Sequence, residues 1–395
     1  MGAIALILPS GYSYGPIMLF LGGLGLLWKR PAIKPEKDDI LILSTLAVYS
    51  LLFMTQLAFE GVSGRYYDRP FRFLLAIPAL FFVLAFPPRL KYLWSGMVIG
   101  NLLTATWALW QKLVLGLDRA SGYTHKIQFG NISMLMGIFC LAGLGWASNQ
   151  KRPKFWIIFL IIGAIAGALG SLLSGSRGGW IGLPFVFLVL YKAYGNRIQN
   201  NTKAKVIGAV LLGALAVYAI PQTGVKKRVN QAFSDIERYQ TGESRTSSLG
   251  TRFEMWKGAI ILIAEKPLLG HGWNGYNVEM TRLVNKGIIH PVVIDRHAHN
   301  EYLDNFARRG ILGLVSLLAL YLIPLSLFSK RIKSEDLEIK SLATAGTLLS
   351  VAYMDFGLSQ VFLSHNSGVM VYAFWMAALW ACLRRKEKCF NSQLT

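Results

Sequence analysis

The residues best suited to chemistry in this chain form a His-Asn pair at the end of a long polar loop. His299 and Asn300 are followed by Gly310 and Gly313, where an apolar helix is predicted to begin. At an ordinary pKa of about 6.5, the His299 imidazole is a free base at neutral pH and can take a proton from an alcohol. We therefore predict His299 as the catalytic base and Asn300 as a secondary candidate.

A carboxylate is expected to hold the second ring nitrogen of His299 and fix its tautomer. Asp295 lies four residues earlier and takes this role if the segment is helical. Glu301 and Asp304 compete for it. His297 would point elsewhere on a helix. Asp295 is therefore the other secondary candidate.

Arg252 is a candidate ligand for a phosphate. Thr251-x-x-Glu254 has the form of a capping box, which predicts a helix that opens at Thr251 with Arg252 as its first helical residue. Free backbone N–H groups and the helix dipole favour an anion there, and a guanidinium adds bidentate donors. The alternative is that Arg252 pairs with Glu254 or Glu243.

Arg177 is a second candidate ligand for the same group. It is the only charge in the turn 174–179, between two apolar stretches, and three glycines surround it. Their lack of side chains lets a ligand approach the backbone closely. The alternative is a snorkelling arginine at a helix end.

Long apolar stretches must position these residues. The chain has 395 residues, of which 53% are hydrophobic and 15% charged, and its apolar runs of roughly 15 to 25 residues match a hydrocarbon core. This predicts an all-α, polytopic helical membrane protein. Residues 2–10, too short to cross alone, leave open a truncated or tilted twelfth helix. Eleven spans are expected near residues 13–28, 39–58, 70–88, 92–115, 126–147, 155–175, 179–194, 206–222, 309–328, 338–357 and 367–383.

Basic residues in the short loops predict the orientation. Alternate loops hold 19 Lys and Arg, and the opposite short loops hold about five. The positive-inside rule therefore places the richer set, and the C-terminus, in the cytoplasm, and it places Arg177, Arg252 and His299 on the outer face of the membrane. The 19 are Lys29, Arg30, Lys34, Lys37, Arg89, Lys91, Lys151, Arg152, Lys154, Arg197, Lys203, Lys205, Lys330, Arg331, Lys333, Arg384, Arg385, Lys386 and Lys388.

The net charge of +21 follows mostly from this topology. Because the basic residues are spread over many loops, contact with anionic membrane lipids explains them better than nucleic acid, which we exclude as a partner. Three cysteines are too few for a disulfide framework. The tyrosines Tyr66 and Tyr67 beside Arg65 on the outer face either stack on sugar or belong to an interfacial aromatic belt.

The predicted organisation has three parts. Residues 1–222 hold the first eight or nine spans, residues 223–308 form a periplasmic, mostly helical loop domain, and residues 309–395 hold the last three spans and a cytoplasmic tail. The loop domain opens with apolar residues at helical spacing over 225–236, which predicts either an interfacial helix or a solvated cap helix packed on its own loop. The Ser/Thr/Gly-rich stretch 242–250 is predicted to be mobile.

The spacing His299-Asn300-x9-Gly310-x2-Gly313 resembles the signature of the O-antigen ligases, bacterial enzymes that move a polysaccharide from undecaprenyl diphosphate onto lipid A-core. The segments 251–256 (Thr-Arg-Phe-Glu-Met-Trp) and 266–272 (Lys-Pro-Leu-Leu-Gly-His-Gly) resemble the outer-loop pattern shared with O-antigen polymerases. The resemblance implies a GT-C-like membrane fold. It also implies that His299 activates the acceptor hydroxyl and that Arg177 and Arg252 hold the donor diphosphate.

The implied reaction is a single displacement with inversion at the anomeric carbon. One base is enough for that route, whereas retention by double displacement calls for a nucleophilic carboxylate as well. We expect no metal and no cofactor, because the acidic pair Asp38-Asp39 is adjacent and predicted to be cytoplasmic, and no phosphate-binding P-loop occurs.

Three alternatives remain open. An O-antigen polymerase would use a second lipid-linked glycan as acceptor. A relative that glycosylates protein is less expected, since such enzymes often carry a larger outer C-terminal portion. A flippase or transporter of lipid-linked polysaccharide would show related halves and midplane ionisable residues, which the sequence does not suggest.

Overall fold

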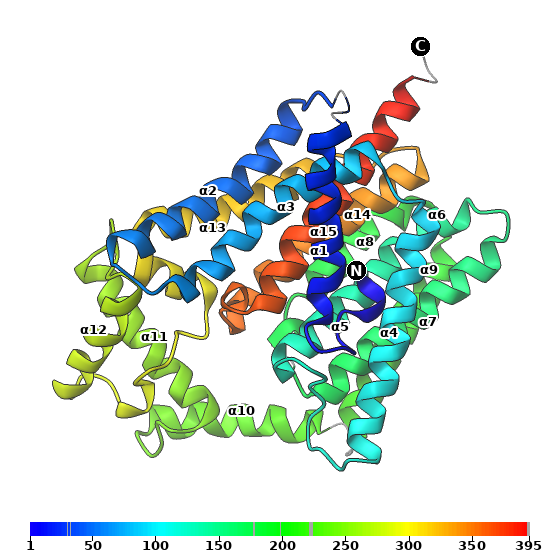
Figure 1. Cartoon of the computed structure of the whole chain (residues 1–395). Helices are drawn as coiled ribbons and strands as arrows, with labels where there is room; N and C mark the ends of the chain where they lie inside the picture. The colour runs from blue at the N-terminus through cyan, green and yellow to red at the C-terminus, as the bar shows by residue number, and fades with distance from the viewer. Residues whose placement is uncertain (30, 32, 177, 198, 221–223, 393–395) are drawn as a thin grey trace.

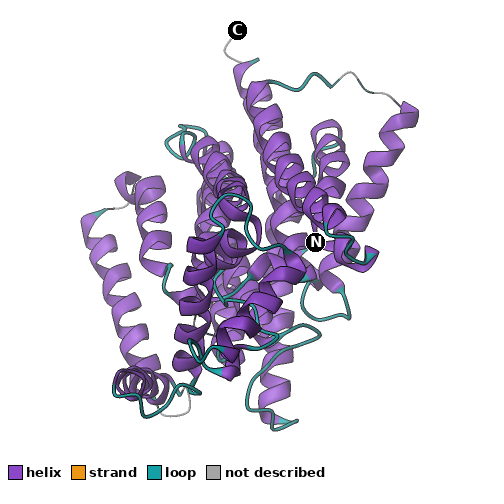
Figure 2. Ribbon diagram, turned by 90° about the vertical axis from the view of Figure 1, so that its left-hand side faces the viewer, coloured by secondary structure: helices purple, strands orange, loops and turns teal. Residues whose placement is uncertain are grey.

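The computed structural model describes residues 1–29, 31, 33–176, 178–197, 199–220 and 224–392 (Figure 1). Every regular element in these ranges is a helix (Figure 2). The α-helices are α1 (Gly11–Lys29), α2 (Lys37–Phe59), α3 (Asp68–Ala85), α4 (Leu90–Leu113), α5 (Lys126–Ala142), α6 (Leu144–Ser148), α7 (Pro153–Ser174), α8 (Leu183–Tyr194), α9 (Asn200–Ala219), α10 (Val225–Gln240), α11 (Ser248–Glu265), α12 (Trp273–Asn285), α13 (Glu301–Ser329), α14 (Leu337–Ser359) and α15 (Asn366–Asn391).

Six helices are long and apolar enough to cross a membrane: α2, α5 continued by α6, α7, α9, α13 and α15. The fold is therefore that of an all-α, multi-pass membrane protein, as the composition predicts. Each of the eleven expected stretches coincides with a helix, although α8 has only 12 residues, about 18 Å, and is short for a 30 Å core. Residues 2–10 do not form a twelfth α-helix, because only the 3-10 turn η1 (Gly2–Ile4) and further turns occur there.

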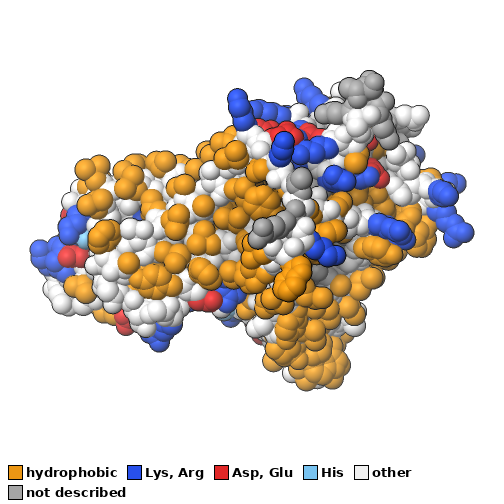
Figure 3. All heavy atoms as spheres, turned by 45° about the horizontal axis from the view of Figure 1, so that its top comes forward, with side chains coloured by type: hydrophobic (Ala, Val, Ile, Leu, Met, Phe, Trp, Pro, Cys, Tyr) orange, Lys and Arg blue, Asp and Glu red, His pale blue; other side chains and the backbone are white. Residues whose placement is uncertain are grey.

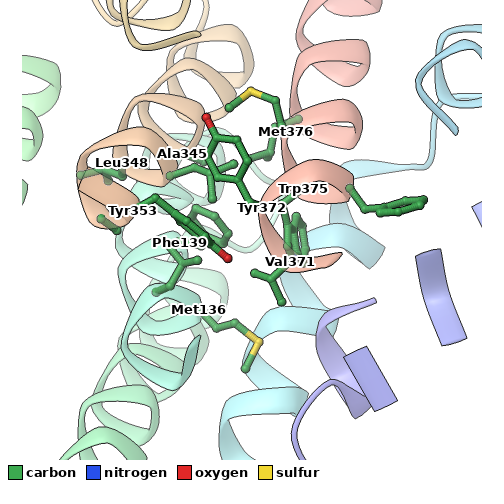
Figure 4. Close-up of a cluster of buried hydrophobic side chains, with 14 of the residues drawn as sticks. Met136, Phe139, Ala345, Leu348, Tyr353, Val371, Tyr372, Trp375 and Met376 are labelled. Atoms are coloured by element: carbon green, nitrogen blue, oxygen red, sulfur yellow. The ribbon is translucent and has the colours of Figure 1, made fainter. Parts of the chain in front are cut away.

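The main core lies where α5, α14 and α15 meet (Figure 4). The rings of Tyr353 and Tyr372 pack at 4.7 Å between centroids, tilted by 54°. Their hydroxyls donate to Gly368 O at 2.7 Å and Leu320 O at 2.5 Å, so neither buried phenol lacks a partner. This packing holds in place the two helix ends that flank the loop between α14 and α15.

Basic side chains gather at the end of the molecule where the C-terminus lies, and hydrophobic side chains cover much of the surface below them (Figure 3). Asp38 and Asp39 belong to this end. Asp38 pairs with Arg331 at 2.7 Å, and the buried Asp39 accepts from Arg384 Nε at 3.1 Å and from Trp380 Nε1 at 2.8 Å. Both carboxylates thus join the ends of distant helices to one another.

The segment with α10, α11 and α12 has a hydrophobic core of its own. This second cluster includes Met255 and Leu262 of α11, Tyr276 of α12 and Ala307 of α13. Helix α10 lies across the direction of the bundle helices (Figures 1 and 2). Phe233 on α10 is 69% exposed, which favours an apolar face turned to a membrane surface over one packed on its own loop.

The stretch 242–250 is not one loop. Helix α11 already begins at Ser248, and the buried Gly250 lies in its first turn. Asp235 of α10 ties the start of α11 to that helix, because its Oδ2 accepts from Leu249 N at 3.3 Å.

Candidate active site

His299 lies in a turn between the 3-10 helix η6 (Pro291–Val293) and α13. Its backbone has φ +48°, and its N–H donates to Nδ1 of His297 at 3.1 Å. The two imidazole rings lie 4.2 Å apart between centroids. His297 therefore does not point away, as a helical segment would require, but forms one pair of rings with His299.

Asp295 does not hold the His299 ring. The segment is a turn instead of a helix, with φ +57° at Asp295 itself, so a spacing of four does not place the two side chains on one face. Asp295 is exposed, and Nδ1 of His299 is buried without a hydrogen-bond partner in the described part of the chain.

Glu301 and Asp304 are committed to other partners. Glu301 Oε2 accepts from Leu363 N at 2.9 Å, and its Oε1 accepts from Asn305 Nδ2 at 3.1 Å. Asp304 pairs with Arg308 at 3.1 Å. Neither carboxylate therefore fixes the tautomer of His299.

Asn300 starts α13. Its Oδ1 accepts from the N–H groups of Tyr302 and Leu303, both at 3.0 Å, as an N-cap side chain does. Its Nδ2 donates to Leu358 O at 3.4 Å. These contacts give Asn300 the task of setting the angle at which the His299 turn enters the helix.

Burial is the main cause that lowers the pKa of His299 to about 3. The neighbouring ring of His297 and the positive charges of Arg252 and Arg296 act in the same direction, and the nearby Gln360 side chain opposes them by favouring the protonated ring. The imidazole is therefore uncharged at neutral pH.

Gln360 follows the end of α14 and is 2% exposed. Its Nε2 lies 3.1 Å from Nε2 of His365, while its Oε1 is buried without a partner in the described ranges. Burial lowers the pKa of His365 to about 4, so this ring too is neutral and can accept at Nε2. The His365 ring in turn stacks on His125 at 5.9 Å.

Arg252 is not the first residue of its helix. Helix α11 begins at Ser248, and the Ser247 hydroxyl caps it by accepting from Gly250 N at 3.1 Å. Arg252 therefore lies one turn further along, and the free N–H groups of the helix start are not beside it. Thr251 caps nothing. The expected capping box was wrong because Ser247, four residues earlier, occupies the N-cap position.

The expected ion pairs of Arg252 are also not made. Glu254 is fully buried and accepts from Tyr239 OH at 2.8 Å and His290 N at 2.7 Å. Glu243 lies 3.5 Å from Arg238. Arg252 has no salt bridge or hydrogen bond in the described part of the protein, and burial lowers its pKa. It is a half-buried, unpaired cation close enough to His299 to influence its charge.

Arg177 lies outside the described residues. The glycines that follow it do pack beside the site: a Cβ on Gly178 would lie 2.2 Å from Oγ of Ser359. Ser359 ends α14, directly before Gln360. The turn 178–179 therefore packs against the end of α14, directly before the loop that carries Gln360.

The segment 266–272 and the Gly310/Gly313 pair meet at a break in α13. Gly310 has φ +61° and ψ −160°, so two helices join there. A Cβ on Gly310 would lie 2.1 Å from Leu268 O, which only glycine avoids. Three backbone hydrogen bonds tie the loop 266–272 to both sides of the break, from Ile311 N to Pro267 O at 2.8 Å, from His271 N to Ala307 O at 2.9 Å and from Gly272 N to Arg308 O at 2.9 Å.

A pocket of about 350 Å³ opens beside the His297 ring. Aromatic rings from α2 and α12 line its wall together with charged side chains from α3, from the loop residues Asp295 and Arg296, and from α13. The residues that line it include Tyr66, Arg69, Trp273, Asp295, Arg296, His297, Glu301, Arg308, Arg309 and His365. Four arginines face three carboxylates in this space.

Comparisons with known proteins give the family of this chain. A family model described as O-Antigen ligase matches residues 162–318, which span α11, α12 and the break in α13. A protein of Haemophilus influenzae described as uncharacterized is 33% identical over 371 residues, which are 93% of this chain and 92% of that protein. The chain belongs to the O-antigen ligase family.

Two named relatives match over shorter stretches. The O-antigen ligase of Escherichia coli is 23% identical over 256 residues, 63% of this chain and 55% of that protein. The General O-oligosaccharyltransferase of Acinetobacter baylyi is 29% identical over 213 residues, 52% of this chain and 35% of that protein. The chain thus spans about a third to a half of the named relatives, and the family assignment makes it a membrane glycosyltransferase of the O-antigen ligase type.

Several residues near His299 had no sequence signal. Gln360 and His365 lie in the loop between α14 and α15, His125 precedes α5 far away in the chain, and nothing in their local pattern indicates that they meet. Arg308 and Arg309 do stand out in the sequence, as adjacent charges at the start of the predicted apolar span 309–328. That pair was the available clue to the pocket.

Proposed function

We propose that this protein transfers a polysaccharide from undecaprenyl diphosphate to a hydroxyl of lipid A-core on the periplasmic face of the bacterial inner membrane. Two side chains carry the proposal. One is the neutral, half-buried imidazole of His299, and the other is the guanidinium of Arg252, which has no salt bridge or hydrogen bond among the described residues. A base and an anion ligand are the two groups that this transfer requires. The orientation rests on the distribution of basic loop residues.

In the proposed reaction the acceptor oxygen forms a bond to the anomeric carbon of the donor sugar. The bond from that carbon to the diphosphate oxygen breaks, and its electron pair leaves with the diphosphate. His299 takes the hydroxyl proton through Nε2. Arg252, with Arg177 from its glycine turn, stabilises the charge that builds on the leaving group. Attack from the face opposite the diphosphate inverts the configuration.

Donor binding would also tune the base. A base of pKa about 3 is too weak to accept a proton readily from an alcohol at neutral pH. Because the charge of Arg252 helps to lower this pKa, a diphosphate seated on Arg252 would raise it toward the working range. The base would then gain strength only when the donor is present, which limits wasteful proton uptake in the empty site.

The decisive experiment is reconstitution of the purified protein with undecaprenyl-diphosphate glycan and lipid A-core, with EDTA present. We expect wild type to form glycosylated lipid A-core, His299→Ala to form none, and Arg252→Ala and Arg177→Ala to be strongly impaired. Lys257→Ala serves as a control on the same helix as Arg252, since Lys257 is exposed and donates only to Ile288 O at 2.7 Å.

Other products would identify other activities. Elongated lipid-linked glycan would indicate a polymerase. Transfer of the glycan to an added envelope protein would indicate an oligosaccharyltransferase. This is a second candidate, which the 29% identity to the Acinetobacter enzyme favours. Movement of the donor across the bilayer that survives His299→Ala, with no glycan transfer, would indicate a flippase and refute the proposal.

A further inference from the structure

We propose that the pocket beside His297 binds a sugar carrying an acidic substituent, a phosphate or a carboxylate, next to the acceptor hydroxyl that is glycosylated. The inference rests on the proposed transferase function, and it names the chemistry of the acceptor. It is carried by three features of the pocket: an aromatic wall, a surplus of unpaired guanidinium groups, and its position against the proposed base.

The aromatic wall suits a sugar ring. Trp273 and Tyr66 are both half-buried and lie 5.4 Å apart between centroids, at an angle of 54°. Phe53 supports Trp273 from below at 5.8 Å. Rings that are partly exposed and held by neighbours present a rigid apolar face, on which the C–H side of a pyranose can stack.

The charges of the pocket are not balanced within it. Asp304 is paired with Arg308, as described above. Arg69 and Arg296 form no salt bridge or hydrogen bond in the described ranges. Arg309 is 5% exposed, donates only from NH1 to Asn305 Oδ1 at 2.7 Å, and keeps a buried Nε with no partner. Guanidinium groups left unpaired in a confined space favour an anion that supplies the missing acceptors.

The position of the pocket relates it to the acceptor. His297 lines the pocket, and its ring lies 4.2 Å from that of His299. A volume of about 350 Å³ lies at the small end of the range for ligand sites and fits one substituted sugar. A sugar held here would place its neighbour in the glycan within reach of the base, so the pocket would select acceptors by the unit beside the reacting one.

The first test measures binding without transfer. Saturation-transfer NMR on the intact protein in lipid nanodiscs compares glucose 6-phosphate, glucose and inorganic phosphate. We expect glucose 6-phosphate to bind more tightly than either single component, and Arg69→Gln and Arg296→Gln to weaken it about tenfold each. Arg72→Gln is the matched control: it lies on the same helix as Arg69, pairs with Asp68 at 2.8 Å and does not line the pocket.

The outcomes separate this proposal from the transferase itself. His299→Ala should lose transfer and keep sugar phosphate binding, whereas Arg296→Gln should weaken that binding about tenfold and raise the KM for a phosphorylated acceptor without changing the KM for the donor. Equal binding of glucose and glucose 6-phosphate, unchanged binding in both arginine variants, or a rise in the donor KM alone would overturn the acidic-sugar assignment. Because Arg296 is exposed, its substitution leaves the fold intact.

Discussion

Nε2 of Gln360 lies 3.1 Å from Nε2 of His365, and this contact orients the whole carboxamide. An amide nitrogen can only donate, so the neutral His365 ring accepts, and Oε1 of Gln360 stays available as an acceptor. Nδ1 of His299 and Oε1 of Gln360 are both buried and unpartnered in the described chain, and the Gln360 side chain is near enough to raise the pKa of His299. We infer that Gln360 holds His299 as its Nδ1–H tautomer during the reaction, which leaves Nε2 free as the base.

Substitution of Gln360 should change the pH profile as well as the rate. We expect Gln360→Ala to lower kcat about 3- to 10-fold, the worth of one hydrogen bond. Gln360→Glu should restore much of the rate but raise the pKa of His299, because a carboxylate favours the charged ring. The acid limb of kcat would then move to higher pH.

A matched control for Gln360 is Gln150→Ala, which removes an amide that donates to Trp146 O at 3.1 Å. It should leave the pH profile unchanged. A Gln360→Glu profile identical to wild type would refute the positioning role.

Removal of the charge of Arg252 should make His299 more basic in the donor-free protein and weaken the binding of the donor. The guanidinium lowers the pKa of His299, so Arg252→Gln raises that pKa in the donor-free protein, visible in a ring 15N titration. Loss of charge-assisted hydrogen bonds should raise the donor KM about 10-fold or more. An unchanged titration of His299 would contradict the electrostatic coupling.

Acid should destabilise the fold through its neutral histidines. The pKa of His365 is lowered to about 4, whereas an unfolded histidine titrates near 6.5. The unfolded state therefore binds a proton that the folded site refuses, and stability falls as pH drops from about 6.5 to about 4, by up to about 1.4 kcal/mol per pH unit. Thermal unfolding of His365→Gln in nanodiscs should show a shallower decline, and an equally steep one would sink the idea.

Gly310→Ala should be severely destabilising. A Cβ there would lie 2.1 Å from Leu268 O, and φ is +61°, so the cost should be about 3 kcal/mol or more in the free energy of unfolding. Gly275→Ala is the control, because the nearest atom to its new Cβ is 3.8 Å away and alanine suits a helix interior. Differential scanning calorimetry of both variants decides the matter, and similar melting temperatures would argue against the break as a fixed joint.

The membrane helices could be predicted well because their signal is local. Length and apolarity located all eleven helical stretches. The periplasmic position of the segment 223–308 stays a prediction. The number of crossings was harder, since α8 shows a short helix where the sequence has a long apolar run. Residues 2–10 failed as a helix because so short a run gains too few hydrogen bonds to offset nucleation.

The role of His299 as the base stays a prediction, and most of the side chains around it were not predicted. His299 stood out by its place before the glycines, yet its φ of +48° has no sequence signature in a non-glycine residue. Because of that turn, the side chain of Asp295 does not contact the His299 ring, whereas the ring of His297 does. The N-cap of α11 was predicted at the wrong residue, because Ser247 and Thr251 are both good N-cap residues. The tertiary contact of Glu254 with His290 N, which takes Glu254 away from the predicted capping box, has no local signal in the sequence.

The hydrogen bonds that tie the loop 266–272 to both sides of Gly310 have a bearing on how specificity can be exchanged among relatives. A chimera that grafts a foreign outer segment with its junction at residue 300 would separate the loop from the helix it was fitted to. Junctions placed beyond Gly313 would carry loop, break and imidazole together as one transferable cassette.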